Sequence, residues 1–386
     1  MPGGRNVRIT GIETIACTGL DPEFILVRLH TDEGPSGLGQ TADFRTAPVL
    51  HDLARRHVLG RDPRDLGRIT YDLFTFARYH GYAGAELRAI SAIDIALWDL
   101  LGKLLDQPVH RLLGGPLRDG VRVYNTCASF GEYQDGRRLW EDPVGLAGDL
   151  LDLGIGALKY APFDRFVEPS LGTDLTDAMA EEALRPAVAI RERFGSRMQI
   201  AIEGHAKLSI NAALRAAQAL ERAQVPVLWL EDLLHPEHAA AWRELKLRTR
   251  FPICGSERAM TRFQLHPLLE AHGIDVLMGD ITWMGGISEL RRCATLAEIY
   301  GVPVAPHDRS GPVNLVAAAH VLVTLPNAYL MESVRAYCQT YYPEVVTPGR
   351  FIEDGILRPP DGPGLGIELT PAFLRREDLR IERTEA

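Results

Sequence analysis

The sequence predicts an α/β protein, in which a (β/α) barrel follows a separate α+β unit. From Val121 onward, short apolar runs alternate with helical patterns, as in a barrel of parallel strands. Within residues 198–335, six such runs end in a carboxylate or a histidine. Residues 1–118 instead show strand patterns first and helical patterns afterwards, without alternation. We therefore expect two units, with the chemistry placed on the barrel.

Length and composition bound the class of protein. The chain has 386 residues, is 46% hydrophobic and 24% charged, and carries a net charge of -9, which is typical of a soluble globular protein and argues against a nucleic-acid surface. There is no run of 18 apolar residues and no apolar segment near the start, so we expect neither a membrane span nor secretion. The five cysteines are scattered, which fits reduced thiols in the cytoplasm.

The α+β unit is predicted from its turn and helix signals. Residues 7–15 and 24–31 read as an antiparallel hairpin, and residues 89–105 read as a helix with one wide apolar stripe. A short strand at residues 362–369 is expected to pack back on this unit. The predicted division is a capping unit at 1–118, a barrel at 119–340 and a returning C-terminal segment at 341–386.

The spacing of the polar strand ends predicts the barrel rim. Residues 121–127 and 157–161 supply the first two strands, and the remaining six strands end in polar residues that are 28, 26, 23, 27 and 25 residues apart. A strand, a loop and a returning helix need about that many residues. In a (β/α) barrel the carboxyl ends of the strands form the catalytic rim. The predicted rim residues are Glu203, Glu231, Glu257, Asp280, His307 and Glu332.

Three of these glutamates predict a metal site. Glu203, Glu231 and Glu257 end consecutive strands, so their carboxylates are expected to converge. Carboxylates held that close repel one another unless a cation lies between them, and hard oxygen ligands suit Mg²⁺, with Mn²⁺ as the alternative. The competing interpretation is that each glutamate pairs with a nearby lysine or arginine or caps the next helix.

The next two strand ends predict a base. A carboxylate such as Asp280 on one nitrogen of His307 would fix the tautomer and raise the basicity of the other nitrogen, as a general base requires. The alternative is that His307 is a lone structural histidine. Asp308, the adjacent carboxylate, is expected to make a loop or cap contact instead.

Three further residues are candidates for the same site. His205 lies two residues after Glu203, so in an extended segment both side chains point the same way, and His205 could protonate a departing hydroxyl; it could also be an exposed loop histidine. Lys159 could balance the carboxylates, or lie on the rim with an exposed head. Glu332 could hydrogen-bond an enolate or a substrate hydroxyl, or form a salt bridge with Arg335.

Several stretches resemble the enolase superfamily, mandelate racemase subgroup, over nearly the whole chain. They are SAIDIALWDLLGK at 91–103, PVHRLLGG at 108–115, GDITWMGGIS at 279–288, PHD at 306–308 and PGLGIEL at 363–369. The resemblance implies a modified (β/α)7β barrel closed by an α+β capping domain, formed by the N-terminus and the C-terminal tail. It also implies that Glu203, Glu231 and Glu257 bind Mg²⁺ and that Asp280 with His307 is the base. Members abstract the proton α to a carboxylate and form a metal-stabilised enediolate.

Two details of the resemblance favour one reaction. Racemases of the family carry Lys-x-Lys on the second strand, whereas this chain has Lys159-Tyr-Ala161, so the second base is missing. Glu203-Gly-His205 is similar to the Asp-x-His motif of galactonate, gluconate and mannonate dehydratases, although Glu replaces their usual Asp.

These details predict a Mg²⁺-dependent hydro-lyase that dehydrates an aldonate or aldarate to a 2-keto-3-deoxy acid. A one-base isomerase (a sugar-acid lactone cycloisomerase or an epimerase) is the alternative, and a catalytically silent sugar-acid binder is the remote one. The partner is a small acid sugar, and a homo-oligomer is expected. Loops near residues 19–24 and 42–47 are expected to set specificity.

Overall fold

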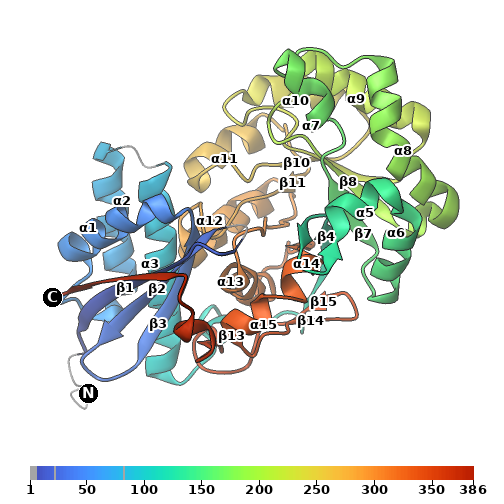
Figure 1. The fold of residues 1–386 in the computed structure, drawn as a ribbon. Coiled ribbons are helices and arrows are strands. Elements are labelled where there is room, and N and C mark those ends of the chain that lie inside the picture. The colour runs from blue at the N-terminus through green and yellow to red at the C-terminus, as the bar shows by residue number, and fades with distance from the viewer. Residues whose placement is uncertain (1–6, 21–22, 81–82) are drawn as a thin grey trace.

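The N-terminal part of the chain is built on an antiparallel sheet. The computed structural model describes residues 7–20, 23–80 and 83–386. The sheet has the order β17-β1-β2-β3, in which β1 (Ile9–Cys17) and β2 (Phe24–Thr31) form the predicted hairpin. Two strands were not predicted: β3 (Ser36–Ala42) extends one side, and β17 (Leu379–Glu385) adds the C-terminal tail to the other. Figure 1 shows this red strand lying beside the blue sheet.

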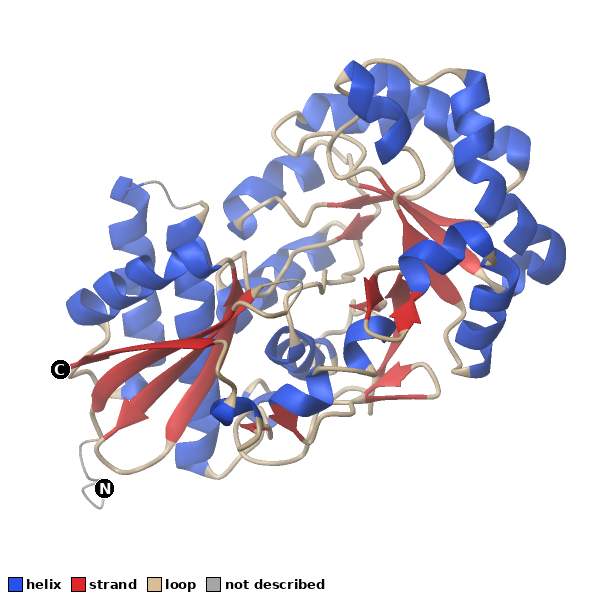
Figure 2. Cartoon of the chain, viewed as in Figure 1, coloured by secondary structure: helices blue, strands red, loops and turns tan. Residues whose placement is uncertain are grey.

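Three helices cover one face of this sheet: α1 (Ala47–His57), α2 (Leu66–His80) and α3 (Ala85–Leu105). Their buried side chains join the inward side chains of the strands in a separate apolar core. Figure 2 shows the three helices on the same side of the strands. The predicted helical stripe at 89–105 lies in α3 and is confirmed. The predicted loop at 19–24 includes residues 21–22, which lie outside the described residues.

Two glycines let α3 approach the sheet closely. A Cβ on Gly37 would lie 2.0 Å from the carbonyl oxygen of Ala96, and a Cβ on Gly39 would lie 2.0 Å from that of Ala92. Real Cβ atoms do not approach oxygen so closely, so any larger residue at these positions must push the helix away from β3.

The rest of the chain forms a ring of parallel strands. In space they run β11-β10-β9-β8-β7-β4, and β12 closes the ring by pairing with β4. All these pairings are parallel. The strands are β4 (Val121–Thr126), β7 (Ala157–Tyr160), β8 (Gln199–Glu203), β9 (Val227–Glu231), β10 (Ile253–Gly255), β11 (Val276–Leu277) and β12 (Met331–Ser333).

The seventh strand position differs from the prediction. The segment 302–307 makes isolated parallel bridges from Val304 to Leu277 and Ala328, and from His307 to Asp280, but no continuous strand. Pro303 and Pro306 lie in this segment and have no N–H to donate, so the ladder is interrupted where a regular strand would need those donors.

Helices follow the first seven strand positions, and together with the eighth strand they make the (β/α)7β arrangement that the resemblance implied. Figure 1 shows α8, α9 and α10 on the outside of the ring. The helices are α5 (Asp135–Glu141), α6 (Pro143–Asp152), α8 (Asp177–Phe194), α9 (Ile210–Ala223), α10 (Ala239–Arg248), α11 (Thr261–Glu270), α12 (Gly286–Ile299) and α13 (Pro312–Leu322).

The tail after the barrel returns to the N-terminal part. The predicted strand at 362–369 is reduced to β16 (Glu368–Leu369), which pairs with β13 (Val346–Thr347). Just before it, the Leu365 N–H donates to Asp99 Oδ1 on α3 over 2.7 Å. The division at residues 118 and 340 stays a prediction. Within the described ranges, no helix is both long and apolar enough to cross a membrane.

Candidate active site

A cavity of about 740 Å³ opens at the carboxyl ends of the barrel strands. Ala42, at the end of β3, also lines it, so the N-terminal sheet reaches the site. Glu231 and Asp280 are fully buried beside the lining residues. The structure therefore brings all eight predicted site residues together. Those that line the cavity are Lys159, Glu203, His205, Glu257, His307 and Glu332.

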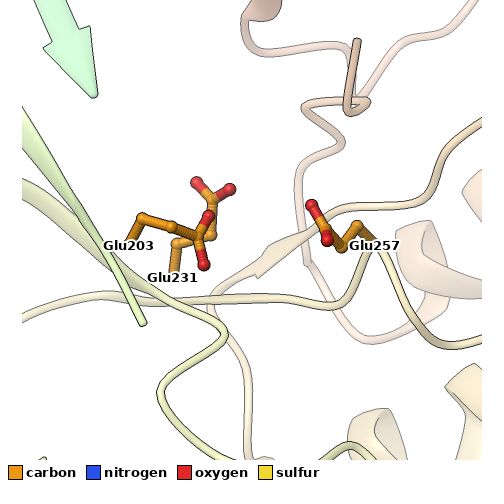
Figure 3. Close-up of side chains that lie close together, drawn as sticks. All are labelled: Glu203, Glu231 and Glu257. Carbon is orange, nitrogen blue, oxygen red and sulfur yellow. The ribbon is translucent and has the colours of Figure 1, made fainter. Parts of the chain in front are cut away.

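The three glutamates converge as predicted. Glu203 and Glu231 are the last residues of β8 and β9, and Glu257 follows β10 by two residues. One oxygen from each lies within 4.8 Å of the others, and Figure 3 shows Glu257 facing the other two carboxylates. All three side chains are buried. Such a set of oxygens suits a hard divalent cation.

The electrostatics of Glu203 and Glu231 also fit a cation. Burial raises the pKa of Glu203 to about 7, and burial together with the neighbouring Glu203 carboxylate raises the pKa of Glu231 well above its usual value. Glu203 Oε2 is buried and accepts no hydrogen bond within the described part of the chain, although it lies 3.4 Å from Lys159 Nζ. A carboxylate oxygen left without a donor, among like charges, is a ligand position that a Mg²⁺ ion would satisfy.

Lys159 is buried among carboxylates, which excludes the alternative of an exposed head. Its Nζ contacts Glu231 and lies 2.8 Å from Glu332 Oε1. Burial alone would lower the pKa of Lys159, but the carboxylates of Glu231, Glu332 and Glu203 raise it well above the usual value. The lysine is therefore held as a cation.

The predicted pair of Asp280 and His307 is formed. His307 Nδ1 lies 2.8 Å from Asp280 Oδ2, and its Nε2 lies 3.0 Å from Glu257 Oε2. Asp280 is held in turn by the Asn314 side chain and by the Thr282 N–H. Burial alone would lower the pKa of His307, but the carboxylates of Glu257, Glu332 and Asp280 raise it well above the usual value.

An aromatic and a cation beside His307 were missed from the sequence. The Trp283 ring lines the cavity with its centroid 5.0 Å from that of His307, and the Arg88 guanidinium lies 4.3 Å from the Trp283 ring. Arg88 comes from α3, so the N-terminal unit reaches His307 through this stack. Trp283 lies within the matched stretch 279–288, but nothing in the sequence pairs it with Arg88.

His205 reaches the cavity by a different path from the one predicted. The segment after Glu203 is not extended, because β8 ends at Glu203 and His205 has a φ of 47°. The turn is fixed by the His205 N–H, which donates to Glu203 Oε1 over 2.6 Å. His205 Nδ1 lies 2.7 Å from Asp164 Oδ2, a partner that the sequence analysis missed. The histidine lines the cavity from a turn, and its side chain is 35% exposed.

Glu332 does not pair with Arg335, which excludes that alternative. Arg335 instead pairs with Asp135, 2.5 Å from Nη2 to Oδ1. Besides Lys159, Glu332 receives hydrogen bonds from Thr126 Oγ1 and, over 3.1 Å, from the Asp308 N–H. Asp308 Oδ1 accepts from the Ser310 N–H over 3.3 Å, which is the loop contact expected for it.

Comparisons with known proteins agree with this arrangement. Residues 6–114 match the mandelate racemase / muconate lactonizing enzyme N-terminal domain, and residues 145–373 match the enolase C-terminal domain-like family. The chain belongs to the mandelate racemase / muconate lactonizing enzyme family of the enolase superfamily. The resemblance and the fold class inferred from the sequence are thereby confirmed.

Members of this family are similar to the chain over almost all of its length. A D-xylonate dehydratase of Haloferax volcanii is 31% identical, covering 95% of this chain and 88% of its own length. A D-galactonate dehydratase of Ralstonia nicotianae is also 31% identical, over 92% and 91%. Among solved structures, an enolase of the mandelate racemase subgroup from Agrobacterium tumefaciens, with sodium and phosphate, is 35% identical with a TM-score of 0.89, over 98% and 99%.

Proposed function

We propose that this chain is a Mg²⁺-dependent hydro-lyase that dehydrates an acid sugar to a 2-keto-3-deoxy acid. The observation that carries the proposal is that His205 lines the same cavity as His307. The reaction needs one group that removes the proton α to the carboxylate and another that protonates the departing hydroxyl. The relatives named as D-xylonate and D-galactonate dehydratases support the same reaction class.

In this proposal, Glu203, Glu231 and Glu257 hold Mg²⁺. When bound, the ion supplies a positive charge that stabilises the anion formed from the substrate carboxylate. Lys159 adds a fixed cation, since the surrounding carboxylates keep it protonated. Glu332 holds Lys159 in place through the contact at 2.8 Å and keeps a carboxylate beside the reacting group.

His307 takes the C2 proton on Nε2, because Asp280 binds Nδ1. Nε2 lies 3.0 Å from Glu257 Oε2, and this carboxylate would turn to the Mg²⁺ ion when the ion is bound. The C3–O bond then breaks, and His205 gives its proton to the hydroxyl, which leaves as water. The resulting enol becomes the 2-keto-3-deoxy acid by taking a proton at C3. The C2 proton is thus taken by His307 and the hydroxyl is protonated by His205, while the enol loses its O–H proton to solvent and C3 takes a proton from solvent. His307 returns its proton to solvent and His205 regains one, so the products are the keto acid and one water molecule.

The experiment is to incubate the purified protein with Mg²⁺ and a panel of pentonates, hexonates and hexarates in D₂O, and to record ¹H NMR spectra. Dehydration gives a keto acid whose C3 has lost its hydroxyl and carries one hydrogen and one deuterium taken from D₂O. A cycloisomerase or an epimerase would give an isomer and no such keto acid, and that result would replace the proposal. Absence of metal-dependent turnover across the panel would instead favour a sugar-acid binder.

A further inference from the structure

His205 is joined to a carboxylate from the neighbouring strand end. Asp164 begins α7 (Asp164–Val167), after β7, whereas His205 follows β8. β7 and β8 are paired in parallel, so their following loops lie side by side. Asp164 Oδ2 lies 2.7 Å from His205 Nδ1 and accepts a hydrogen bond from Lys207 Nζ over 2.8 Å.

From this contact we infer that Asp164 is a positioning residue for dehydration: it holds the Nδ1–H of His205 and thereby presents Nε2 to the departing hydroxyl. The inference rests on the proposed function and deepens it. A carboxylate that accepts from one ring nitrogen fixes which nitrogen is left for chemistry. Asp164 therefore pairs with Nδ1 of His205 as Asp280 pairs with Nδ1 of His307. Each of these two histidines of the cavity is thus paired with a carboxylate.

Hydrogen bonds from neighbouring side chains keep Asp164 ionised, as its positioning role requires. Burial alone would raise the pKa of Asp164, but the hydrogen bonds from His205 and Lys207 lower it, so the group stays a carboxylate. The ring is also restrained from its backbone, because the His205 N–H is tied to Glu203 and the Ala206 N–H donates to the Asp232 carbonyl over 2.5 Å. The backbone contacts hold the turn that carries His205, and the contact with Asp164 orients the imidazole.

Removal of the C2 proton and loss of the hydroxyl should respond differently to a change at Asp164. Removing Asp164 should slow loss of the hydroxyl while leaving removal of the C2 proton by His307 intact. The enediolate would then return to substrate more often, and in D₂O the recovered substrate would gain deuterium at C2. A change that merely loosened the fold would slow both steps alike.

The test compares Asp164→Asn with Lys207→Met in the Mg²⁺-loaded enzyme, using the substrate found in the panel. For Asp164→Asn we expect kcat to fall about 10–100-fold, KM to stay within about twofold, and deuterium at C2 of the recovered substrate to rise relative to product. Lys207→Met removes the other partner of Asp164 and should leave kcat within about threefold, since His205 keeps its carboxylate.

Four outcomes overturn the inference. If Asp164→Asn turns over like the wild type, or if exchange at C2 falls in step with dehydration, Asp164 does not position His205. If the wild type forms no keto acid, the proposed function fails and the inference with it. An independent readout is the ¹⁵N spectrum of the His205 ring in its neutral form: the wild type should carry the Nδ1–H tautomer, and Asp164→Asn should lose that preference. The protonated ring carries N–H on both nitrogens, and its Nε2–H is the proton given to the hydroxyl. A neutral Nε2–H tautomer in the wild type would also overturn the inference.

Discussion

His307 and Asp280 are joined twice, once through the backbone and once through their side chains. Their backbones form a parallel β-bridge, and His307 Nδ1 lies 2.8 Å from Asp280 Oδ2. Pro303 and Pro306 interrupt the rest of this strand. The β-bridge is nevertheless formed at His307, the residue whose side chain pairs with Asp280. The direction of the imidazole therefore depends on the sheet itself.

Replacing the imidazole should stop the reaction without removing the metal site. We expect His307→Asn to lower kcat at least about 10²–10⁴-fold, because the proton at C2 loses its acceptor. Mg²⁺ affinity should change little, since Glu203, Glu231 and Glu257 remain. Turnover is measured by keto-acid formation and metal binding by calorimetry. Dehydration at near wild-type rate in the variant would contradict the assignment of the base.

The pH dependence of metal-free stability should report the burial of Glu203. The pKa of Glu203 is raised to about 7 by burial, so the folded chain binds a proton there that the unfolded chain releases above about 4.5. Protonated Glu203 therefore contributes favourably to the free energy of folding below about pH 4.5, and this contribution is lost as the pH rises through about 7. In the presence of a chelator, the stability of the wild type relative to Glu203→Gln should therefore increase by about 1–3 kcal/mol as the pH falls through this range.

Chemical denaturation at several pH values measures this difference. Saturating Mg²⁺ should abolish the pH trend in the wild type and stabilise it more than Glu203→Gln. A relative stability that does not change between pH 7 and 4.5 would show that burial does not raise the pKa of Glu203 in the metal-free protein.

A buried histidine should make the fold sensitive to acid. His320 lies on α13, accepts a hydrogen bond on Nδ1 from the His110 N–H, and its Nε2 lies 3.1 Å from the Leu365 carbonyl oxygen. A proton on Nδ1 would oppose the His110 N–H, and burial lowers the pKa of His320 to about 3. Neutral His320 thus stabilises the fold above about pH 6.5, and this contribution is lost as the pH falls from 6.5 towards 3.

The loss should approach about 1.4 kcal/mol per pH unit. The measurement is the stability of the wild type against His320→Gln, which cannot titrate, between pH 7 and 4.5. The gap between the two proteins should narrow as the pH falls. A gap that stays constant would show that His320 does not titrate differently in the folded and unfolded chains.

The close approach of α3 to the sheet gives a prediction about stability alone. Gly39→Ala should destabilise the fold by about 1–3 kcal/mol, since the new Cβ would meet the Ala92 carbonyl oxygen and backbone would have to move. Gly67→Ala is the matched control: it lies in α2, a Cβ there meets nothing within 4 Å, and alanine favours the helix. The Tm of Gly39→Ala should therefore fall, and the Tm of Gly67→Ala should rise. Equal shifts of the two Tm values would contradict the packing argument.

The strand-end rule explains why so much of the site could be read from the sequence. Parallel strands in a barrel deliver their terminal residues to one rim, so regular spacing alone predicted that Glu203, Glu231, Glu257, Asp280, His307 and Glu332 would meet. The rule holds even for His307, although residues 302–307 form no continuous strand. The single β-bridge between His307 and Asp280 is enough to place His307 at the rim.

The contacts that the sequence does not predict depend on the loops and on the N-terminal unit. Asp164 and Arg88 carry no pattern that ties them to His205 or Trp283, and their contacts arise from how the loop after β7 folds and from where α3 docks. The local reasoning for His205 failed because it assumed an extended backbone where the chain takes a left-handed turn. Glycine usually signals that conformation, whereas any other residue, histidine included, adopts it in only a small fraction of cases.

The place of β17 in the N-terminal sheet has a consequence for synthesis of the chain. β1 pairs on one side with β2, which follows within a few residues, but on the other with β17, more than 360 residues later. During translation the outer edge of β1 is thus left without its partner until the whole barrel has been made, and an open strand edge invites pairing with other chains. Shielding of this edge during that interval would therefore favour folding of the chain over aggregation.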